Sequence, residues 1–246
     1  MVRNPYYPEQ VTRYVLNPSV VDVLVFCTKN PQPMISRLER LSTYDMFWFV
    51  TITPYGREIE PFVPPKEKVI ESFRQLSEMT GREKMSWRYD PVFITEKYSV
   101  DYHIACFAEM TEKLRGYTGQ CVVSFLDLYE KTKRNFREAR GVTRDEQERI
   151  IEAFAGIAEA NGMQVPKKKT AREACSCLLG ADIGVYNTCG HGCLYCYANY
   201  DRKSVEENRK RHDVNSPLLI GHLKETDHVK EAQQKSFKDT QMRLFL

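Results

Sequence analysis

Five cysteines gather in one stretch of the chain, at positions Cys175, Cys177, Cys189, Cys193 and Cys196. The last three are spaced C-x3-C-x2-C, in the sequence C-G-H-G-C-L-Y-C. Three thiolates at this spacing can hold one corner of a [4Fe–4S] cluster and leave the fourth iron open to a ligand. The spacing therefore predicts a metal site at Cys189, Cys193 and Cys196, with Cys175 and Cys177 as further candidate ligands.

Zinc is the main alternative to an iron–sulfur cluster. Structural zinc sites use pairs of thiolates or imidazoles in a closed set of four ligands. Cys175 and Cys177 could supply one pair and Cys193 and Cys196 the other, with His191 as a spare ligand. We favour iron–sulfur because the full C-x3-C-x2-C motif lies between a strand-like and a helix-like segment. A disulfide is the weakest interpretation in a chain without a secretion signal.

The elements that must position these cysteines alternate between strand-like and helix-like patterns. Ser99 and the pair Thr143 and Glu146 have the types and spacing of helix N-caps. Repeated βα units of this length indicate a parallel sheet covered by helices. The predicted strands cover 21–26, 46–52, 84–89 and 120–126, and the predicted helices cover 34–41, 66–79, 99–114 and 143–160.

The C-terminal part has a different character. We expect a short strand at 182–186, the cysteine loop at 187–196 and a polar helix at 197–212. The strand would lie beside the one at 21–26 and complete the sheet. The predicted organisation is a βα-barrel-like domain at 1–165, a cysteine-rich segment at 166–212 that completes the same domain, and a partly helical tail at 213–246.

Polar residues follow each predicted strand. The carboxyl ends of parallel strands meet at one edge of a sheet, where the loops build active sites. We attribute the polarity of Arg57, Glu58 and Tyr129 to ordinary surface loops. The predicted catalytic residues are Lys29, Asn30, Arg88, Asp90 and Asp127, and the predicted cofactor-binding residues are Thr53, Ser124 and Tyr195.

Composition limits the class of protein. The net charge is +3, with 42% hydrophobic and 28% charged residues, so bulk charge gives no argument for nucleic acid or membrane. No apolar run approaches the roughly 20 residues that span a bilayer. Residues 1–8 lack an apolar signal core, and we expect a cytoplasmic protein in which clustered cysteines bind metal. Cys27, Cys106 and Cys121 fit buried small hydrophobic residues.

The motif, with Tyr195 before its last cysteine, resembles the radical S-adenosylmethionine (SAM) signature. That resemblance implies a [4Fe–4S] cluster held by three cysteines, with SAM on the open iron. It also implies an electron donor, because one electron cleaves SAM to methionine and a 5′-deoxyadenosyl radical. The cofactor carries this chemistry, while the protein orients it.

The wider sequence resembles the uncharacterised DUF1848 family. The segments that carry the resemblance are V-F-C-T-K-N-P at 25–31, T-I-T-P-Y-G at 51–56, W-R-Y-D-P at 87–91, S-F-L-D at 124–127 and D-I-G-V-Y-N-T-C-G-H-G-C-L-Y-C-Y-A-N at 182–199.

Two features depart from the usual radical SAM pattern. The cysteine motif follows the last predicted strand instead of the first, which resembles a circular permutation. The position of a glycine-rich SAM motif is occupied by Thr28, Lys29 and Asn30. The predicted fold class is α/β, a partial or permuted TIM-type (βα) barrel with a C-terminal cysteine-rich strand–loop–helix unit.

Three functions remain open from the sequence. The first is a radical-SAM-like enzyme acting on an unknown small-molecule or macromolecular substrate. The second is a non-catalytic iron–sulfur or zinc protein in which the metal has a structural role. The third is nucleic-acid binding or lesion repair, although a solvated helix face explains the charge run near Arg209 better. The basic residues that would serve it are Lys167–Lys169, Arg172, Arg202, Lys203 and Arg209–Arg211.

Overall fold

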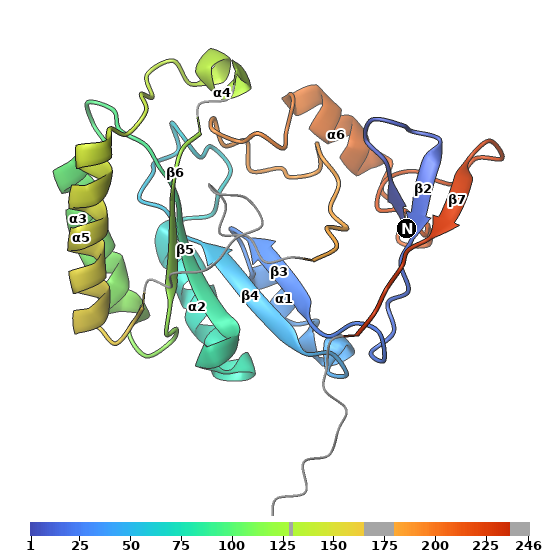
Figure 1. The fold of residues 1–246 in the computed structure, drawn as a ribbon, viewed down its shortest axis with the longest axis horizontal. Helices are drawn as coiled ribbons and strands as arrows, with labels where there is room; N and C mark the ends of the chain where they lie inside the picture. Colours follow the sequence, from blue (N-terminus) through green and yellow to red (C-terminus); the bar gives the residue numbers. More distant parts are fainter. Residues whose placement is uncertain (128–129, 165–179, 237–246) are drawn as a thin grey trace, which may run out of the picture.

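A four-stranded parallel sheet with the spatial order β3-β4-β5-β6 is the main element of the fold (Figure 1). The computed structural model describes residues 1–127, 130–164 and 180–236. A smaller sheet with the order β1-β2-β7 lies at the opposite end of the molecule from α3 and α5 (Figure 1). The described residues therefore form an α/β fold with a second, short sheet.

The bounds of the elements are as follows. The strands are β1 (Val2–Arg3), β2 (Gln10–Arg13), β3 (Leu24–Thr28), β4 (Met46–Thr51), β5 (Met85–Val92), β6 (Cys121–Phe125) and β7 (His228–Glu231). The helices are α1 (Gln32–Ile35), η1 (Leu38–Leu41), α2 (Lys66–Thr80), η2 (Arg82–Lys84), α3 (Val100–Leu114), α4 (Glu130–Asn135), α5 (Arg144–Ala160) and α6 (Arg202–Lys210).

One face of the parallel sheet packs against α2, α3 and α5 and forms the main core. Trp48 and Trp87 lie on this face, and both are fully buried. The rings of Phe107 on α3 and Phe154 on α5 stack with their centroids 3.8 Å apart. Burying such aromatic side chains contributes several kcal/mol in total at roughly 25 cal/mol per Å². This core fixes the positions of the strand ends.

The other face of the sheet carries the polar residues. Because paired residues of parallel strands share a face, the register places Cys27 with Phe49 and Arg88 with Thr51 on the side away from the two tryptophans. Cys27 is exposed, and Arg88 is half-buried. The sheet thus has a helix-covered apolar face and a second face with ionisable side chains.

The predicted strands and helices of the sheet are confirmed to within a few residues. The Ser99 side chain accepts a hydrogen bond from the Tyr102 N–H at 3.2 Å and caps α3. Thr143 and Glu146 form the expected capping box at the start of α5. The segment predicted as one helix at 34–41 forms two short pieces, α1 and η1. Local patterning located these elements because each is defined by its own sequence.

The predicted strand at 182–186 is wrong. These residues form no regular structure, and the Gly184 N–H donates to Asp182 Oδ1 at 2.8 Å instead of to a neighbouring strand. Residues 182–184 are exposed, so little apolar burial favours a strand there. The cysteine-rich unit is therefore a loop followed by a helix, and the four-stranded sheet has β3 and β6 as its edges among the described residues.

The C-terminal helix and tail also differ from expectation. The polar helix begins at Arg202 instead of 197, because Asp201 caps it by accepting from the Ser204 N–H at 2.8 Å. The described part of the tail forms β7 instead of a helix, and β7 pairs in parallel with β2 near the N-terminus. Arg3 and Asp227 join the same region by an ion pair.

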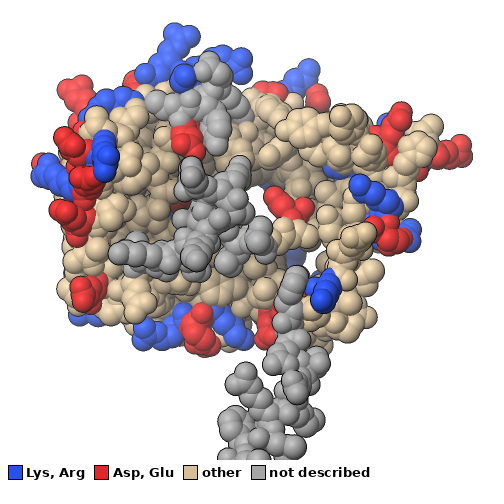
Figure 2. Space-filling model, viewed as in Figure 1, with Lys and Arg blue, Asp and Glu red and all other residues tan. Residues whose placement is uncertain are grey.

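Figure 2 shows Lys and Arg interspersed with Asp and Glu over the visible face, with no large area of one sign. No helix in the described ranges has the length and apolarity needed to cross a membrane.

Candidate metal centre

The predicted site residues of the strand ends lie at one edge of the parallel sheet, as expected. Lys29 and Asn30 directly follow β3, and Thr53 follows β4 by two residues. Arg88 and Asp90 lie near the end of β5, and Ser124 lies near the end of β6. Within this edge the side chains divide into two groups.

The first group surrounds a buried carboxylate. Glu60 is 1% exposed and accepts hydrogen bonds from Lys29 Nζ at 2.9 Å, Lys66 Nζ at 2.6 Å and Thr53 Oγ1 at 2.6 Å. The hydroxyl of Tyr195 also donates to this carboxylate. We call these five residues the Glu60 network. It joins the ends of β3 and β4, the start of α2 and the cysteine loop.

The electrostatics of the Glu60 network favour its ionised form. Burial raises the pKa of the Glu60 carboxyl, but the charges of Lys29 and Lys66 and the hydrogen bonds outweigh burial and hold this pKa at about 2. Burial also lowers the pKa of Lys66, although Glu60 opposes that effect. Two ammonium groups pair with one carboxylate, so these three side chains carry a net positive charge.

Hydrogen bonds within the cysteine loop hold its two ends together. The Asn187 N–H donates to the Ala198 carbonyl at 3.0 Å, and the Cys196 N–H donates to the Cys193 carbonyl at 3.1 Å. Gly192 has a φ of 67°, a left-handed conformation that glycine adopts without strain. The Asn199 side chain donates to the Cys189 carbonyl at 2.7 Å. These bonds give the C-x3-C-x2-C motif a defined backbone.

The same loop is attached to the segment that carries Glu60. The Phe62 N–H donates to the His191 carbonyl at 3.1 Å, and the Leu194 N–H donates to the Ile59 carbonyl at 3.0 Å. Tyr195 is 8% exposed and packs in a second apolar cluster with Tyr55 and other residues. Two backbone hydrogen bonds and a buried aromatic ring therefore fix the loop at the carboxyl edge of the sheet.

The three thiols differ in exposure. Cys189 is exposed, whereas Cys193 and Cys196 are half-buried. Burial raises the pKa of the Cys193 thiol to about 12, against the charge of Lys29, which lowers it. Among the described residues, no group of three or more His, Cys, Asp or Glu side chains is arranged to hold a metal ion. Cys175 and Cys177 lie outside the described residues.

The chemistry around the thiols nevertheless fits a bound group. His191 Nδ1 and Asn199 Oδ1 are buried and have no hydrogen-bond partner among the described residues. Folded proteins leave few buried polar atoms unpaired, and these two are the members of a set of six in the described residues that lie in or just after the motif. Three soft sulfur donors on one loop are the set that iron–sulfur clusters use. Cys189, Cys193 and Cys196 would hold such a cluster.

The second group at this edge is an ion pair with more access to water. Arg88 pairs with Asp90, and the Ser124 hydroxyl donates to the other carboxylate oxygen. The side chains of Arg88 and Asp90 are 28% and 21% exposed. We call these three residues the Arg88–Asp90 group.

Cys27 and Asp182 lie beside the Arg88–Asp90 group. Although Cys27 is exposed as a residue, neighbouring atoms shield its thiol from water and raise the pKa of the thiol; the charge of Arg88 lowers this pKa, and the charge of Asp182 raises it. Asp182 therefore comes within electrostatic reach of the end of β3, although no strand forms at 182–186.

The other residues named from the sequence lie in a local turn, at the surface or outside the described residues. The Asn30 N–H donates to Thr28 Oγ1 at 2.9 Å, which forms a local turn after β3. Asp127 is exposed, and Tyr129 lies outside the described residues. Arg57 and Glu58 are exposed, and Glu58 accepts hydrogen bonds from Lys97 and Tyr98 at the surface.

Sequence reasoning missed the two central members of the Glu60 network. Glu60 is one of several polar residues after β4, and Lys66 is the first residue of α2. One signal was present, because Glu60 stands between Ile59 and the apolar run Pro61–Val63. A carboxylate in such a run needs buried cationic or hydrogen-bonding partners.

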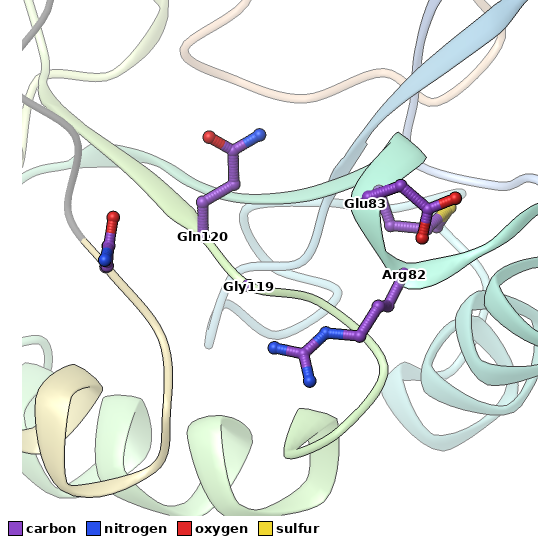
Figure 3. A pocket seen from close by; sticks show the side chains of 6 residues that line it. Arg82, Glu83, Gly119 and Gln120 are labelled. Carbon is purple, nitrogen blue, oxygen red and sulfur yellow. The ribbon is translucent and has the colours of Figure 1, made fainter.

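A pocket of about 270 Å³ lies at the opposite edge of the sheet, where β5 and β6 begin (Figure 3). None of the predicted site residues contributes to it. Its lining residues are Arg82, Glu83, Met85, Gly119, Gln120 and Gln164. The pocket is therefore separate from the cysteine loop.

Comparison with known proteins gives a family and no assigned activity. A family model described as a domain of unknown function (DUF1848) matches residues 1–167 and 163–198. No curated protein matches the chain, and no solved structure matches it. The two matched segments cover most of the sequence and include the cysteine loop. The chain belongs to the DUF1848 family.

Proposed function

We propose that this protein is a radical-SAM-like enzyme whose [4Fe–4S] cluster is held by Cys189, Cys193 and Cys196. The observation that carries the proposal is the position of the cysteine loop. Tyr195, between the last two cysteines, donates to Glu60 at the carboxyl edge of a parallel sheet. In βα folds this edge is where active sites are built. The proposal retains a partial TIM-type barrel as the architecture.

The chain's own residues have distinct roles in this proposal. The cluster, once bound and reduced, would supply the electron that cleaves SAM. Lys29, Thr53 and Tyr195 hold the loop through Glu60. The partly exposed Arg88–Asp90 group, with Asn30 and Asp127 after β3 and β6 at the same edge of the sheet, offers charged and polar contacts to SAM or to a substrate. A low-potential electron donor is required, and we place the protein in the cytoplasm, where thiols stay reduced.

The test is reductive cleavage of SAM. The full chain is purified and reconstituted anaerobically with iron and sulfide, reduced with dithionite, and supplied with SAM. We expect 5′-deoxyadenosine from the native protein and none from Cys193→Ser. Cys106→Ser is the matched control, because Cys106 is also half-buried but lies on α3. A reconstituted cluster that yields no 5′-deoxyadenosine would reject the SAM chemistry.

A structural metal site is the second candidate. It is favoured by the position of the loop, because a metal bound there would tie α6 and the C-terminal segment to the sheet. Asn208 on α6 already donates to the Asn187 carbonyl at 3.1 Å. Zinc in the purified protein, without iron or sulfide, would support this function over the enzyme.

Nucleic-acid binding has less support. Arg202 and Lys203 on α6 pair with Glu206 and Glu207, so that face of the helix alternates in charge. Residues 167–169 and 172 lie outside the described part of the chain. Binding to DNA that weakens steeply with salt would be needed to revive this function.

A further inference from the structure

We propose that the Glu60 network positions the cysteine loop and also supplies the positive charge that favours reduction of the bound cluster. The second role rests on the proposed function, whereas the first does not. The inference combines three observations: the burial of Glu60, the contact of Tyr195 with it, and the excess of lysine over carboxylate.

Because Glu60 is buried, the network restricts the position of the cysteine loop. Glu60 is 1% exposed, so each of its oxygens needs hydrogen-bond partners from the protein. Lys29 and Thr53 donate to one oxygen and Lys66 donates to the other. Tyr195 completes the set from a position 135 residues away in sequence. Displacing the loop would remove a donor from a buried carboxylate, which is costly.

The contact is placed where it can control the thiols. Tyr195 lies one residue before Cys196 and two after Cys193. Lys29 also lies over the Tyr195 ring, with its Nζ 5.6 Å from the ring centroid. Leu194 adds a backbone hydrogen bond to Ile59. The two thiols of the C-x2-C pair therefore flank the segment that is most firmly attached to the sheet.

The net charge of the network is positive, which is the sign that would favour reduction of a negatively charged cluster. Three thiolates leave a [4Fe–4S] cluster with a net negative charge, and one-electron reduction adds another negative charge. Lys29 and Lys66 together exceed Glu60 by one positive charge. Both ammonium groups are partly shielded from water, with 15% and 25% exposure, so their field is screened less than that of surface lysines.

The redox step itself is simple. One electron would pass to the cluster from a low-potential one-electron donor, which is oxidised; in the test this donor is the sulfur dioxide radical anion formed from dithionite. No bond in the protein or the cluster forms or breaks. Lys29 and Lys66 would stabilise the added charge and so raise the reduction potential. Burial is the main cause of the lowered pKa of Lys66, and the charge of Lys29 lowers it further.

The chain contains counterparts for three members of the network, namely Glu60, Lys29 and Tyr195. Glu58 lies two residues from Glu60 and also accepts from a lysine and a tyrosine, Lys97 and Tyr98. The Glu58 and Lys97 side chains are 49% and 62% exposed. The pair Lys29→Met with Lys97→Met compares a largely buried with an exposed lysine. The pair Tyr195→Phe with Tyr98→Phe compares two buried tyrosines, whose hydroxyls donate to a buried and to an exposed carboxylate, respectively.

The positioning role is tested in the metal-free full chain by amide hydrogen exchange. We expect Tyr195→Phe to speed exchange of the Leu194 and Cys196 N–H groups at least about tenfold, because the loop loses its hydrogen bond to a charged group. Tyr98→Phe should leave these two amides unchanged. Equal exchange in Tyr195→Phe and the native chain would overturn the positioning role.

The charge role is tested by the midpoint potential of the reconstituted cluster. Lys29→Met removes the excess charge together with one hydrogen bond to Glu60, which keeps Lys66 as its counter-ion, and we expect the potential to fall. Lys97→Met should leave it unchanged. A potential unaffected by Lys29→Met, or shifted equally by both variants, would overturn the charge role. If no cluster forms in the native chain, the proposed function and the charge role both fail, and the exchange result still decides the positioning role.

Discussion

The Glu60 network and the Arg88–Asp90 group lie at the same edge of the sheet, but water reaches them differently. Glu60 is 1% exposed and has four donors, whereas Asp90 is 21% exposed and has Arg88 and Ser124. A buried carboxylate with a complete set of partners stabilises one arrangement of the chain. A partly hydrated ion pair can exchange its partner for a ligand at low cost. Position at this edge of the sheet alone therefore does not distinguish a fully buried charge cluster from a partly hydrated one.

Replacing the buried carboxylate is expected to give the largest effect. Glu60→Gln leaves Lys29 and Lys66 without their counter-ion, and loss of a buried partner costs about 3–5 kcal/mol of unfolding free energy. Glu58→Gln, at the exposed carboxylate nearby, should cost about 0–1 kcal/mol. Urea unfolding of both variants measures the difference. Equal losses would remove the distinction between buried and exposed carboxylates.

The pH dependence of the Glu60→Gln effect sharpens the same comparison. The pKa of Glu60 is about 2 in the folded protein and about 4.5 in the unfolded chain, so the unfolded state binds more protons between these values. The stability that Glu60 contributes is complete above pH 4.5 and is lost as the pH falls towards 2. We therefore expect the difference between native protein and Glu60→Gln to shrink over that window. A difference constant down to pH 2 would contradict this assignment.

A histidine in the core should cause a second loss of stability in a different pH range, and this loss serves as an internal reference. Burial lowers the pKa of His103 to about 4, and the ring contacts the Tyr89 hydroxyl at 2.8 Å and the Phe93 carbonyl at 2.9 Å. The unfolded state binds more protons between about 4 and 6.5, so stability falls as the pH falls through this range, by up to about 3 kcal/mol. His103→Gln should make the urea concentration at the unfolding midpoint less dependent on pH between pH 6.5 and 4. An unchanged pH profile in His103→Gln would show that another group causes the loss.

The smallest effect on stability is expected at the Arg88–Asp90 group. Asp90→Asn keeps the shape of the side chain and removes one charge of a partly hydrated pair, so we expect a loss of about 1 kcal/mol or less. Under the proposed function, the same variant should strongly reduce the rate of SAM cleavage while it lowers the free energy of unfolding only slightly. Thermal unfolding and SAM cleavage of the same preparation measure both. A stability loss as large as that of Glu60→Gln would place this pair with the structural charges.

Much of the sheet was predictable because its elements carry local patterns. Trp48 and Trp87 lie in apolar strand sequences, and Ser99 and Thr143 mark helix starts by their own chemistry. The parallel arrangement followed from the alternation of strands and helices, and it brought the polar strand ends to one edge.

The parts that were not predictable depend on contacts between distant segments. β2 has four residues and pairs with β7 more than 200 residues later, so neither carries a distinctive local signal. Residues 182–186 have strand-like apolar residues but no partner strand among the described residues. The Glu60 network joins Lys29, Lys66 and Tyr195, which were named separately or overlooked because only the folded chain brings them together.

The central claim is that Cys189, Cys193 and Cys196 hold an iron–sulfur cluster at the carboxyl edge of the sheet. The most direct measurement is the content of iron, acid-labile sulfide and zinc in anaerobically purified native protein, Cys193→Ser and Cys106→Ser. We predict about four iron and four sulfide per chain in the native protein and in Cys106→Ser, and almost none in Cys193→Ser. Zinc without iron or sulfide, or iron that is unaffected by Cys193→Ser, would contradict the claim.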